Sequence, residues 1–322
     1  MKSYSPRFVS SETCSRSALN AAQSAAPNGR CLTRGVPLSP GLLLSGEKPD
    51  FLKIVSAKLE KQHGIGLFEA CSVNDDLGAE TVFREYGAVF VAEGVTVPSK
   101  CIFATEAEVT AFQSKLETST RSVGGTTITL QRPAMDALIA AREAARKSGL
   151  SITPRGGPNA ASRSFATTLR FWNSRLYPGL EHWKRQGRIT AKDVADIRKA
   201  TIPEQVDKVL RWEQEGIYFA RGFSKSILYS VAAPGASQHI SMLALDVTQF
   251  GNGRVREILA KHGWHRTVLS DLPHFTYLGV PENDLPRLGL EKKTSGGEVF
   301  WVPDLRTEKE GLRTENGTGE VR

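Results

Sequence analysis

The stretch SQHISMLALDV, residues 237–247, says more about the fold than any other part of the sequence. From Leu243 to Val247, apolar side chains occupy alternate positions, which is the pattern of a β-strand with one buried face. Asp246 falls on the opposite face of that strand. The Pro-Gly pair and the serines that precede Leu243 favour a turn. We therefore expect His239 to lie on a turn that enters the strand, close to Asp246.

Helical patterns flank this strand in the sequence. Thr105 and Glu108 form a capping box ahead of apolar residues at helical spacing. Pro133 suits the first position of a second helix, and Gly149 suits the position just after its end. We expect this second helix to have one apolar face, made of Met135, Leu138, Ile139 and Ala145. The sequence predicts helices over residues 105–116, 133–148, 190–200, 203–215 and 254–262, and a β-like segment over 88–91.

Many helices and few strands indicate an α+β fold class. Composition divides the chain into a flexible leader, a small N-terminal region, an α+β domain and a disordered tail, over residues 1–50, 51–120, 121–302 and 303–322. The role of the small N-terminal region stays open. It could be an appended domain, an inhibitory segment or part of the same core.

The composition is that of a globular protein with a basic surface. Of the 322 residues 40% are apolar, and 42 basic against 34 acidic residues give a formal net charge of +8. A positive balance favours encounters with polyanions, among them nucleic acid and anionic cell-wall polymer. No nucleic-acid-binding motif is visible, so we expect no nucleic-acid partner. The sequence contains no run of 18 apolar residues, so we expect no transmembrane segment.

The cysteines and the N-terminal residues do not indicate where in or outside the cell the protein is located. No C-x-x-C pair is present, which argues against a cysteine zinc site. A Cys71–Cys101 bridge and unpaired buried thiols both fit the pattern. The N-terminus lacks the basic head, apolar stretch and cleavage site of a secretory signal. Localisation and oligomeric state therefore stay open.

His239, Asp246 and His274 supply the ligand types that zinc prefers. A catalytic zinc site takes imidazole and carboxylate ligands from three side chains and keeps one position for water. Asp271 stands three residues before His274, and a carboxylate there could accept a proton from the attacking water and deliver it to the leaving amine. Pro273 stiffens the loop that carries both residues.

Two sequence motifs that contain these four residues connect them to one known protein family. S-x-H-x(6)-D at residues 237–246 and D-x-P-H-F at 271–275 resemble peptidase family M15. That family includes D-Ala-D-Ala carboxypeptidases, D-Ala-D-Ala dipeptidases and L-alanyl-D-glutamate endopeptidases, and it shares its zinc fold with the Hedgehog signalling domain. The similarity covers residues 130–282. It implies a Hedgehog/DD-peptidase-like zinc domain, with a small antiparallel sheet flanked by helices, inside the region 121–302.

The resemblance also implies roles for single residues. It implies one Zn²⁺ ion with the ligands His239, Asp246 and His274. Asp271 is expected to be the catalytic base. The Ser-Arg-Ser segment at 162–164 is similar to a substrate-binding segment of the family, so Arg163 is expected to contact the substrate and stabilise the developing oxyanion. Ser237 lies in no nucleophile elbow, and we interpret it as a group that hydrogen-bonds the substrate or supports a ligand.

Three departures from the family pattern bear on the substrate. Asp271 replaces the Glu of many carboxypeptidase members and is typical of the endopeptidase branch. Met242 replaces a common Gly, which predicts a narrower approach to the metal. The gap between Arg163 and His239 is long, which predicts inserted helices near 181–215. Aromatic residues in this region are interpreted as packing groups rather than as a platform for sugars: Phe171, Trp172 and Trp183.

The sequence thus predicts a zinc metallopeptidase that hydrolyses peptide bonds of D-amino acids in peptidoglycan stem peptides, with D-Ala-D-Ala carboxypeptidase activity as the leading hypothesis. An L-alanyl-D-glutamate endopeptidase is the enzymatic alternative. The non-enzymatic alternative is a Hedgehog-like zinc-binding module. The resemblance, and nothing else in the sequence, leads us to expect a cell-envelope or extracellular location.

Overall fold

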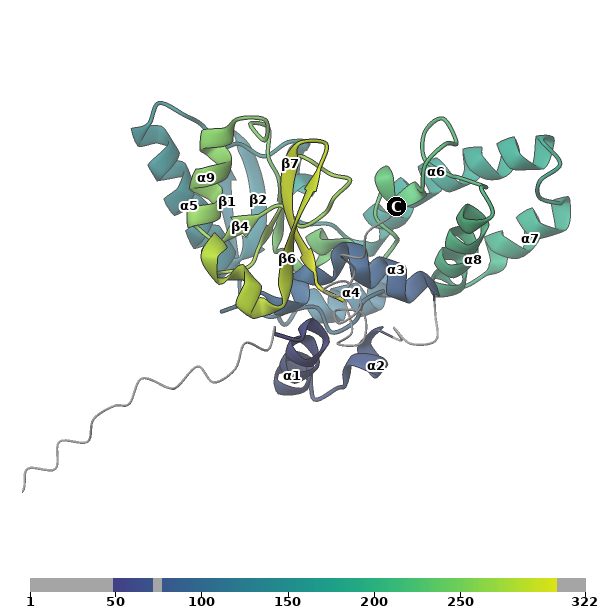
Figure 1. Cartoon of the computed structure of the whole chain (residues 1–322), viewed down its shortest axis with the longest axis horizontal. Helices are drawn as coiled ribbons and strands as arrows, with labels where there is room; N and C mark the ends of the chain where they lie inside the picture. Colours follow the sequence, from purple (N-terminus) through teal and green to yellow (C-terminus); the bar gives the residue numbers. More distant parts are fainter. Residues whose placement is uncertain (1–48, 72–76, 306–322) are drawn as a thin grey trace, which may run out of the picture. The chain divides into compact units, whose positions relative to one another are not determined.

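The computed structural model describes residues 49–71 and 77–305, which form an α+β structure of helices and small antiparallel sheets (Figure 1). The predicted α+β class is therefore confirmed. The predicted leader lies outside the described residues up to residue 48. Of the predicted tail, the first three residues belong to the described fold, where Asp304 is buried and its backbone N–H donates to Gly289 O at 3.0 Å.

Several of the helices begin at a capping side chain. The α-helices are α1 (Phe51–His63), α2 (Leu67–Cys71), α3 (Leu77–Tyr86), α4 (Glu106–Gln113), α5 (Arg132–Lys147), α6 (Phe165–Arg185), α7 (Ala191–Lys199), α8 (Ile202–Gln214) and α9 (Gly253–Lys261). Those with a capping side chain include α1, α4, α6, α7 and α9. Thr105 begins α4 as predicted, because its side-chain oxygen accepts the backbone N–H of Glu108. The five predicted helices are confirmed as α4, α5, α7, α8 and α9, although α4 ends three residues early. None of the helices in the described part of the chain is long and apolar enough to cross a membrane.

The strands form three small antiparallel sheets within the described residues. Two of these sheets are hairpins, made of β1 (Thr118–Val123) with β2 (Thr126–Gln131) and of β6 (Leu290–Ser295) with β7 (Glu298–Pro303). The third sheet has the order β3-β5-β4, with bounds Ala244–Asp246, His274–Tyr277 and Trp264–His265. The strand predicted over 243–247 is confirmed as β3, and the flanking Leu243 and Val247 are fully buried.

Two expectations about single segments are wrong. Residues 88–91 form no strand but lie in the 3₁₀-helix Gly87–Val91, with side chains only 0–4% exposed. A short apolar run that is buried on every side has no periodicity that separates strand from helix. Ile139 is 41% exposed, whereas the preceding Leu138 is fully buried. One residue turns a helix by about 100°, which carries Ile139 past the edge of the buried face.

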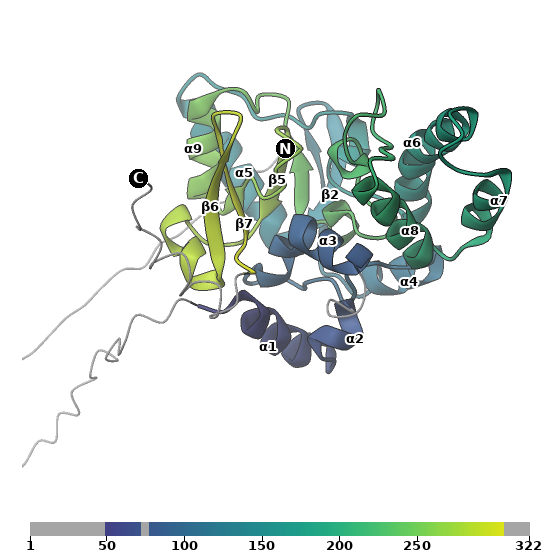
Figure 2. The same ribbon diagram turned by 45° about the vertical axis from the view of Figure 1, so that its right-hand side comes forward.

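The main hydrophobic core contains residues from both the 51–120 region and the region after it. Phe51 of α1 and Val89 of the 3₁₀-helix belong to the same buried cluster as Leu138 of α5 and Phe275 of β5. Helices α5 and α9 lie side by side in both views of the molecule (Figures 1 and 2). The N-terminal region therefore contributes to the core that supports the central sheet.

A second cluster of buried residues contains side chains of α3, α6, α7 and α8. Trp172 is fully buried in it and donates its indole N–H to Gln205 Oε1 at 2.9 Å. Gly179 allows a close approach here, because a Cβ atom at this position would lie 2.4 Å from the ring of Phe219. The helices α7 and α8 occupy the segment where the sequence predicts inserted helices. Trp172 and Trp183 pack in or against this cluster, as expected.

A disulfide joins Cys71 at the end of α2 to Cys101, thirty residues later in the sequence. Of the two states that the sequence left open, the bridge is the one found. A cross-link over a loop of this length stabilises a fold by about 3–4 kcal/mol, chiefly by restricting the unfolded chain. We therefore expect the Cys71→Ala/Cys101→Ala variant to lose about that much in urea unfolding. Reductant should lower the unfolding midpoint of the wild-type protein and leave that of the variant unchanged. Equal midpoints for the two proteins in the absence of reductant would contradict this expectation.

Candidate metal centre

The central sheet places two of the predicted ligands opposite each other. In the antiparallel pairing of β3 with β5, Asp246 lies directly across from His274. Side chains at paired positions have Cβ atoms about 5 Å apart and point to the same face. The loop before β5 supports this position, because His274 N–H donates to Asp271 O at 3.2 Å.

His239 reaches the same place from a short 3₁₀-helix, Gln238–Ser241, that immediately precedes β3. Met242 ends this helix in the left-handed region, with φ +57°, and turns the chain into the strand. The expectation that His239 lies on a turn entering the strand is confirmed. A non-glycine residue in this conformation is strained by about 1 kcal/mol, which the burial of Leu243 and its neighbours offsets.

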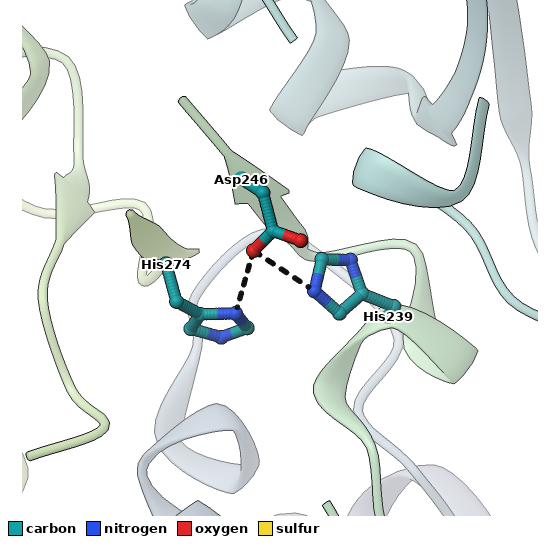
Figure 3. Close-up of side chains that lie close together, drawn as sticks. All are labelled: His239, Asp246 and His274. Atoms are coloured by element: carbon teal, nitrogen blue, oxygen red, sulfur yellow. Dashed lines mark hydrogen bonds and ion pairs between the residues drawn. The ribbon is translucent and has the colours of Figure 1, made fainter. Parts of the chain in front are cut away.

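The three side chains converge on one carboxylate oxygen (Figure 3). Asp246 Oδ1 lies 3.3 Å from His239 Nε2 and 3.3 Å from His274 Nδ1. Ligand atoms about 2.0–2.1 Å from a tetrahedral zinc ion are separated from one another by roughly 3.3–3.4 Å. The distances from Asp246 Oδ1 to the two ring nitrogens already have that length. One ligand atom from each residue lies within 4.8 Å of the others. His239 and His274 are buried and Asp246 is partly buried, and together they could hold a metal ion.

Gln238 fixes the tautomer of His274. The Gln238 amide Nε2 donates to the backbone carbonyl of Tyr86 at 2.8 Å, which turns its Oε1 toward His274 Nε2, also at 2.8 Å. His274 Nε2 must then carry the hydrogen, so in the neutral ring Nδ1 presents its lone pair to Asp246 Oδ1. Two lone-pair atoms at this distance repel each other unless a cation or a proton lies between them. The arrangement is therefore satisfied by a bound cation or by a proton shared with Asp246.

His239 is available as a neutral ligand over the whole physiological range. It is 1% exposed, and neither of its ring nitrogens has a hydrogen-bond partner among the described residues. Burial, with the nearby charge of Arg163, lowers the pKa of His239 to about 3. Burial alone would raise the pKa of Asp246, but His239 and His274 outweigh it and hold that pKa well below the usual range. Buried nitrogens without hydrogen-bond partners beside an ionised carboxylate suit a set of metal ligands.

Arg163 holds the other oxygen of the carboxylate. Its Nη2 lies 2.8 Å from Asp246 Oδ2, and its Nε donates to Asn159 O at 3.0 Å. The backbone N–H of Arg163 donates to His239 O at 3.2 Å, which places the start of α6 next to the ligand set. A guanidinium that anchors Oδ2 orients Asp246 so that Oδ1 faces the two histidines. Much of the hydrogen-bonding capacity of Arg163 is thereby used inside the protein.

A pocket of about 360 Å³ opens beside these side chains. His239, His274, Arg163, Ser237 and Asp271 all line it, so every predicted site residue except the anchored Asp246 faces this cavity. Asp271 as a whole is exposed, yet surrounding protein atoms desolvate its carboxyl group. This desolvation, with the negative charge of Asp246 nearby, raises the pKa of Asp271 even though His274 and two arginines oppose the shift. A carboxylate of raised pKa beside a metal site is suited to accept a proton.

Sequence reasoning missed several residues at this pocket. Gln238 adjoins His239 in the sequence, but only the fold shows that its amide bridges Tyr86 and His274. Tyr86 comes from α3 and has no local signal of function. Burial, with the charges of Glu85 and Asp271, raises its pKa well above the ordinary value, so it carries its proton. The missed residues that line the pocket are Tyr86, Gln238, Ser270, Tyr229 and Arg175.

Met242 differs from what the sequence leads us to expect, and Phe171 lies at the wall of the pocket. Met242 is not among the residues that line the pocket and packs instead beside Ile240 and its neighbours, so it does not narrow the approach to the ligands. Phe171 does line the pocket, and its ring contacts the guanidinium of Arg163 at 5.4 Å.

The fold and the side chains thus define a site of two histidines and one aspartate that can hold a metal ion, with a carboxylate and an arginine beside it. Comparison with known proteins adds no identification. The chain matches no protein-family model, and comparisons with curated proteins and with solved structures also find no significant match.

Replacing Gln238 should weaken metal binding without removing any ligand. Gln238→Leu removes the acceptor for His274 Nε2–H, and loss of such a support typically lowers metal affinity about 10- to 100-fold. The matched control is Gln131→Leu, because Gln131 is equally buried (2% exposed each) and bonds Thr96 and Ser241 but neither histidine. Competition titration with a chelating dye measures the affinity. Equal zinc affinities for the two variants would contradict the role of Gln238.

The metal-free protein should lose stability in acid. Between about pH 6.5 and 3, the unfolded state binds a proton on His239 that the folded state excludes, so the free energy of unfolding falls as pH decreases. The slope from this group is about 1.4 kcal/mol per pH unit. Urea unfolding at several pH values, with a chelator present to keep the protein metal-free, measures this slope. His239→Gln should show a shallower slope, and identical slopes would contradict the excluded proton.

Proposed function

We propose that this protein is a zinc-dependent peptidase that hydrolyses peptide bonds of D-amino acids, with the D-Ala-D-Ala end of peptidoglycan stem peptides as the leading substrate. The observation that carries the proposal is the convergence of His239 Nε2 and His274 Nδ1 on one oxygen of Asp246, at 3.3 Å each, at the wall of an open pocket. The resemblance of the motifs around these residues to peptidase family M15 supports the choice of reaction.

The residues present suit zinc better than other common ions. Zinc is commonly bound by imidazole and carboxylate ligands, whereas calcium and magnesium prefer sites made of oxygen atoms. When bound, zinc supplies Lewis acidity, which polarises a carbonyl group and makes water more acidic. The unpaired ring nitrogens of His239 and the fixed tautomer of His274 supply two of the donors that such an ion requires.

The roles of the chain's own groups follow from their places. Asp271 takes the proton of the attacking water and passes it to the leaving amine, which its raised pKa favours. Arg163 holds Asp246 in place and adds positive charge where the oxyanion develops. Ser237 and Tyr86 line the same pocket and are among the neutral polar residues that could hydrogen-bond the peptide.

The proposal is tested by incubating the zinc-loaded protein with a pentapeptide that ends in D-Ala-D-Ala. Release of free D-Ala, which stops when a chelator is added and returns with zinc, is the expected result. Cleavage of an L-alanyl-D-glutamate bond without D-Ala release would replace the carboxypeptidase by the endopeptidase alternative. If neither bond is cut at any zinc concentration that fills the site, the peptidase proposal fails, and a Hedgehog-like binding module would explain the site better.

Two further expectations follow for partners. The basic net charge of +8 suits an anionic wall polymer, and we expect no specific nucleic-acid binding. A steep loss of DNA or RNA affinity between low and moderate salt would be the signature of such binding, and gel-shift assays at low salt would reveal it.

A further inference from the structure

The pocket beside the metal centre extends along α6, well beyond the histidines. Thr168, Phe171 and Arg175 all line it. Their spacing of three and four residues puts them on one face of the helix. Because α6 starts beside His239, this face leads from the ligand set to a second charged position in the same cavity. Arg175 marks the far end of that face.

The guanidinium of Arg175 is held from one side and unsatisfied on the other. Its Nη1 donates to Ser174 Oγ at 2.9 Å and to Ser174 O at 3.3 Å. Its Nε is buried without a hydrogen-bond partner among the described residues, and the side-chain hydrogen bonds found for Arg175 are the two that Nη1 donates to Ser174. Nε and Nη2 form the edge with which arginine binds a carboxylate through two parallel hydrogen bonds. A buried donor left unpaired costs free energy, so this edge favours an incoming acceptor.

No acidic side chain compensates Arg175. Among the described residues it forms no ion pair, and the charged neighbour that affects it most is another cation, Arg221. Burial, together with the charge of Arg221, lowers the pKa of Arg175 from its ordinary value. This contrasts with Arg163, which is tied to Asp246 at 2.8 Å. Of the two arginines in the pocket, Arg175 is the one that forms no ion pair with an acidic side chain among the described residues.

We propose that Arg175 is a specificity subsite that binds a carboxylate of the peptide substrate at a distance from the scissile bond, with Arg221 strengthening the local positive potential. The proposal rests on the peptidase function proposed above. At about 1.5 Å per residue, α6 rises about 15 Å between Phe165 and Arg175. An extended peptide advances about 3.3 Å per residue. The carboxylate is therefore about three to five residues from the bond that is cut, which points to acidic peptides longer than a dipeptide.

The test compares peptides that differ only in one carboxylate. One pair is acetyl-Glu-Ala-Ala-D-Ala-D-Ala and its Gln counterpart. The other is acetyl-Ala-D-Gln-Ala-Ala-Ala as the free acid and as the C-terminal amide, so that the two pairs cover both sides of the metal centre. Calorimetry on the zinc-loaded Asp271→Asn protein measures binding without turnover. We expect the acid to bind at least about tenfold more tightly than its neutral partner in one pair or both.

Introducing Arg175→Gln into the Asp271→Asn protein should abolish the preference for the acidic peptide of each pair, while the neutral peptides bind as before. The control is Arg185→Gln, which removes the same charge from an exposed position on the same helix and should keep the preference. Equal affinities within both pairs, or a preference that survives Arg175→Gln, would overturn the subsite. Failure of the wild-type protein to cleave any of these peptides would contradict the peptidase function instead, because the binding comparison does not depend on turnover.

Discussion

Asp271→Asn is expected to reduce peptide hydrolysis by about 10²- to 10⁴-fold while the protein keeps its metal. The amide has the shape of the carboxylate but cannot accept a proton from water, and general acid–base catalysis contributes an effect of that size. Asp271 is not one of the three converging side chains, and its raised pKa reflects burial of the carboxyl group beside them. The expected loss is therefore in kcat rather than in zinc affinity.

The measurement is hydrolysis of a D-Ala-D-Ala pentapeptide by wild-type and variant proteins, each with its zinc content determined. Asp196→Asn is the matched control, because this aspartate lies exposed on α7 and pairs only with the neighbouring Lys192 among the described residues. The control should match the wild type. An Asp271→Asn protein with full activity would remove this residue from the mechanism, and one that has lost its zinc would make it a structural support instead.

The second large effect is expected from His239→Gln. Glutamine has a similar volume but no imidazole, so we expect zinc affinity to fall by about 10³-fold or more. The metal-free variant should not be less stable than the metal-free wild type, because neither ring nitrogen of His239 has a hydrogen-bond partner among the described residues. Most buried substitutions destabilise a protein, so this combination is a distinctive signature of a ligand.

Thermal or urea unfolding with and without zinc separates these outcomes. Zinc at a thousand times its dissociation constant should add about 4 kcal/mol to the free energy of unfolding of the wild-type protein. The same zinc concentration should add no more than about 0.4 kcal/mol to His239→Gln, because the affinity of this variant is at least about 10³-fold lower. His262→Gln, at the end of α9 and outside the ligand set, is the control and should behave as wild type. A zinc response that survives in His239→Gln would exclude this histidine as a ligand.

The ligand set could be predicted from sequence because its geometry is local. The strand pattern from Leu243 to Val247 fixed the face of Asp246, and the turn before it fixed the approach of His239. His274 could be added because of the motif that surrounds it. Its place directly opposite Asp246 depends on the register of β3 with β5, which nothing in either segment specifies.

The rest of the site could not be predicted because it depends on contacts between distant segments. The bond from Gln238 to the Tyr86 carbonyl joins residues that are 152 positions apart. Arg175 follows Phe171 in an ordinary amphipathic helix, where an arginine at this spacing usually faces water. Only the return of the chain at Tyr229 and Ser230 closes a pocket over that face.

The 3₁₀-helix at Gly87–Val91 was predicted as a strand for a related reason. Its side chains are buried on all sides by elements from both ends of the chain, so its apolar run reflects burial and not periodicity. The same burial makes residues 51–120 part of the core. The N-terminal region also contributes Tyr86 to the pocket wall, which no pattern in that region indicates.

The central claim is that His239, Asp246 and His274 bind one metal ion. It is tested most directly by measuring the zinc content of the purified protein after saturation and gel filtration. We predict about one zinc per wild-type chain, and close to none in a variant in which both histidines are replaced by Gln. No bound zinc in the wild-type protein, or the same content in the double variant, would contradict the account.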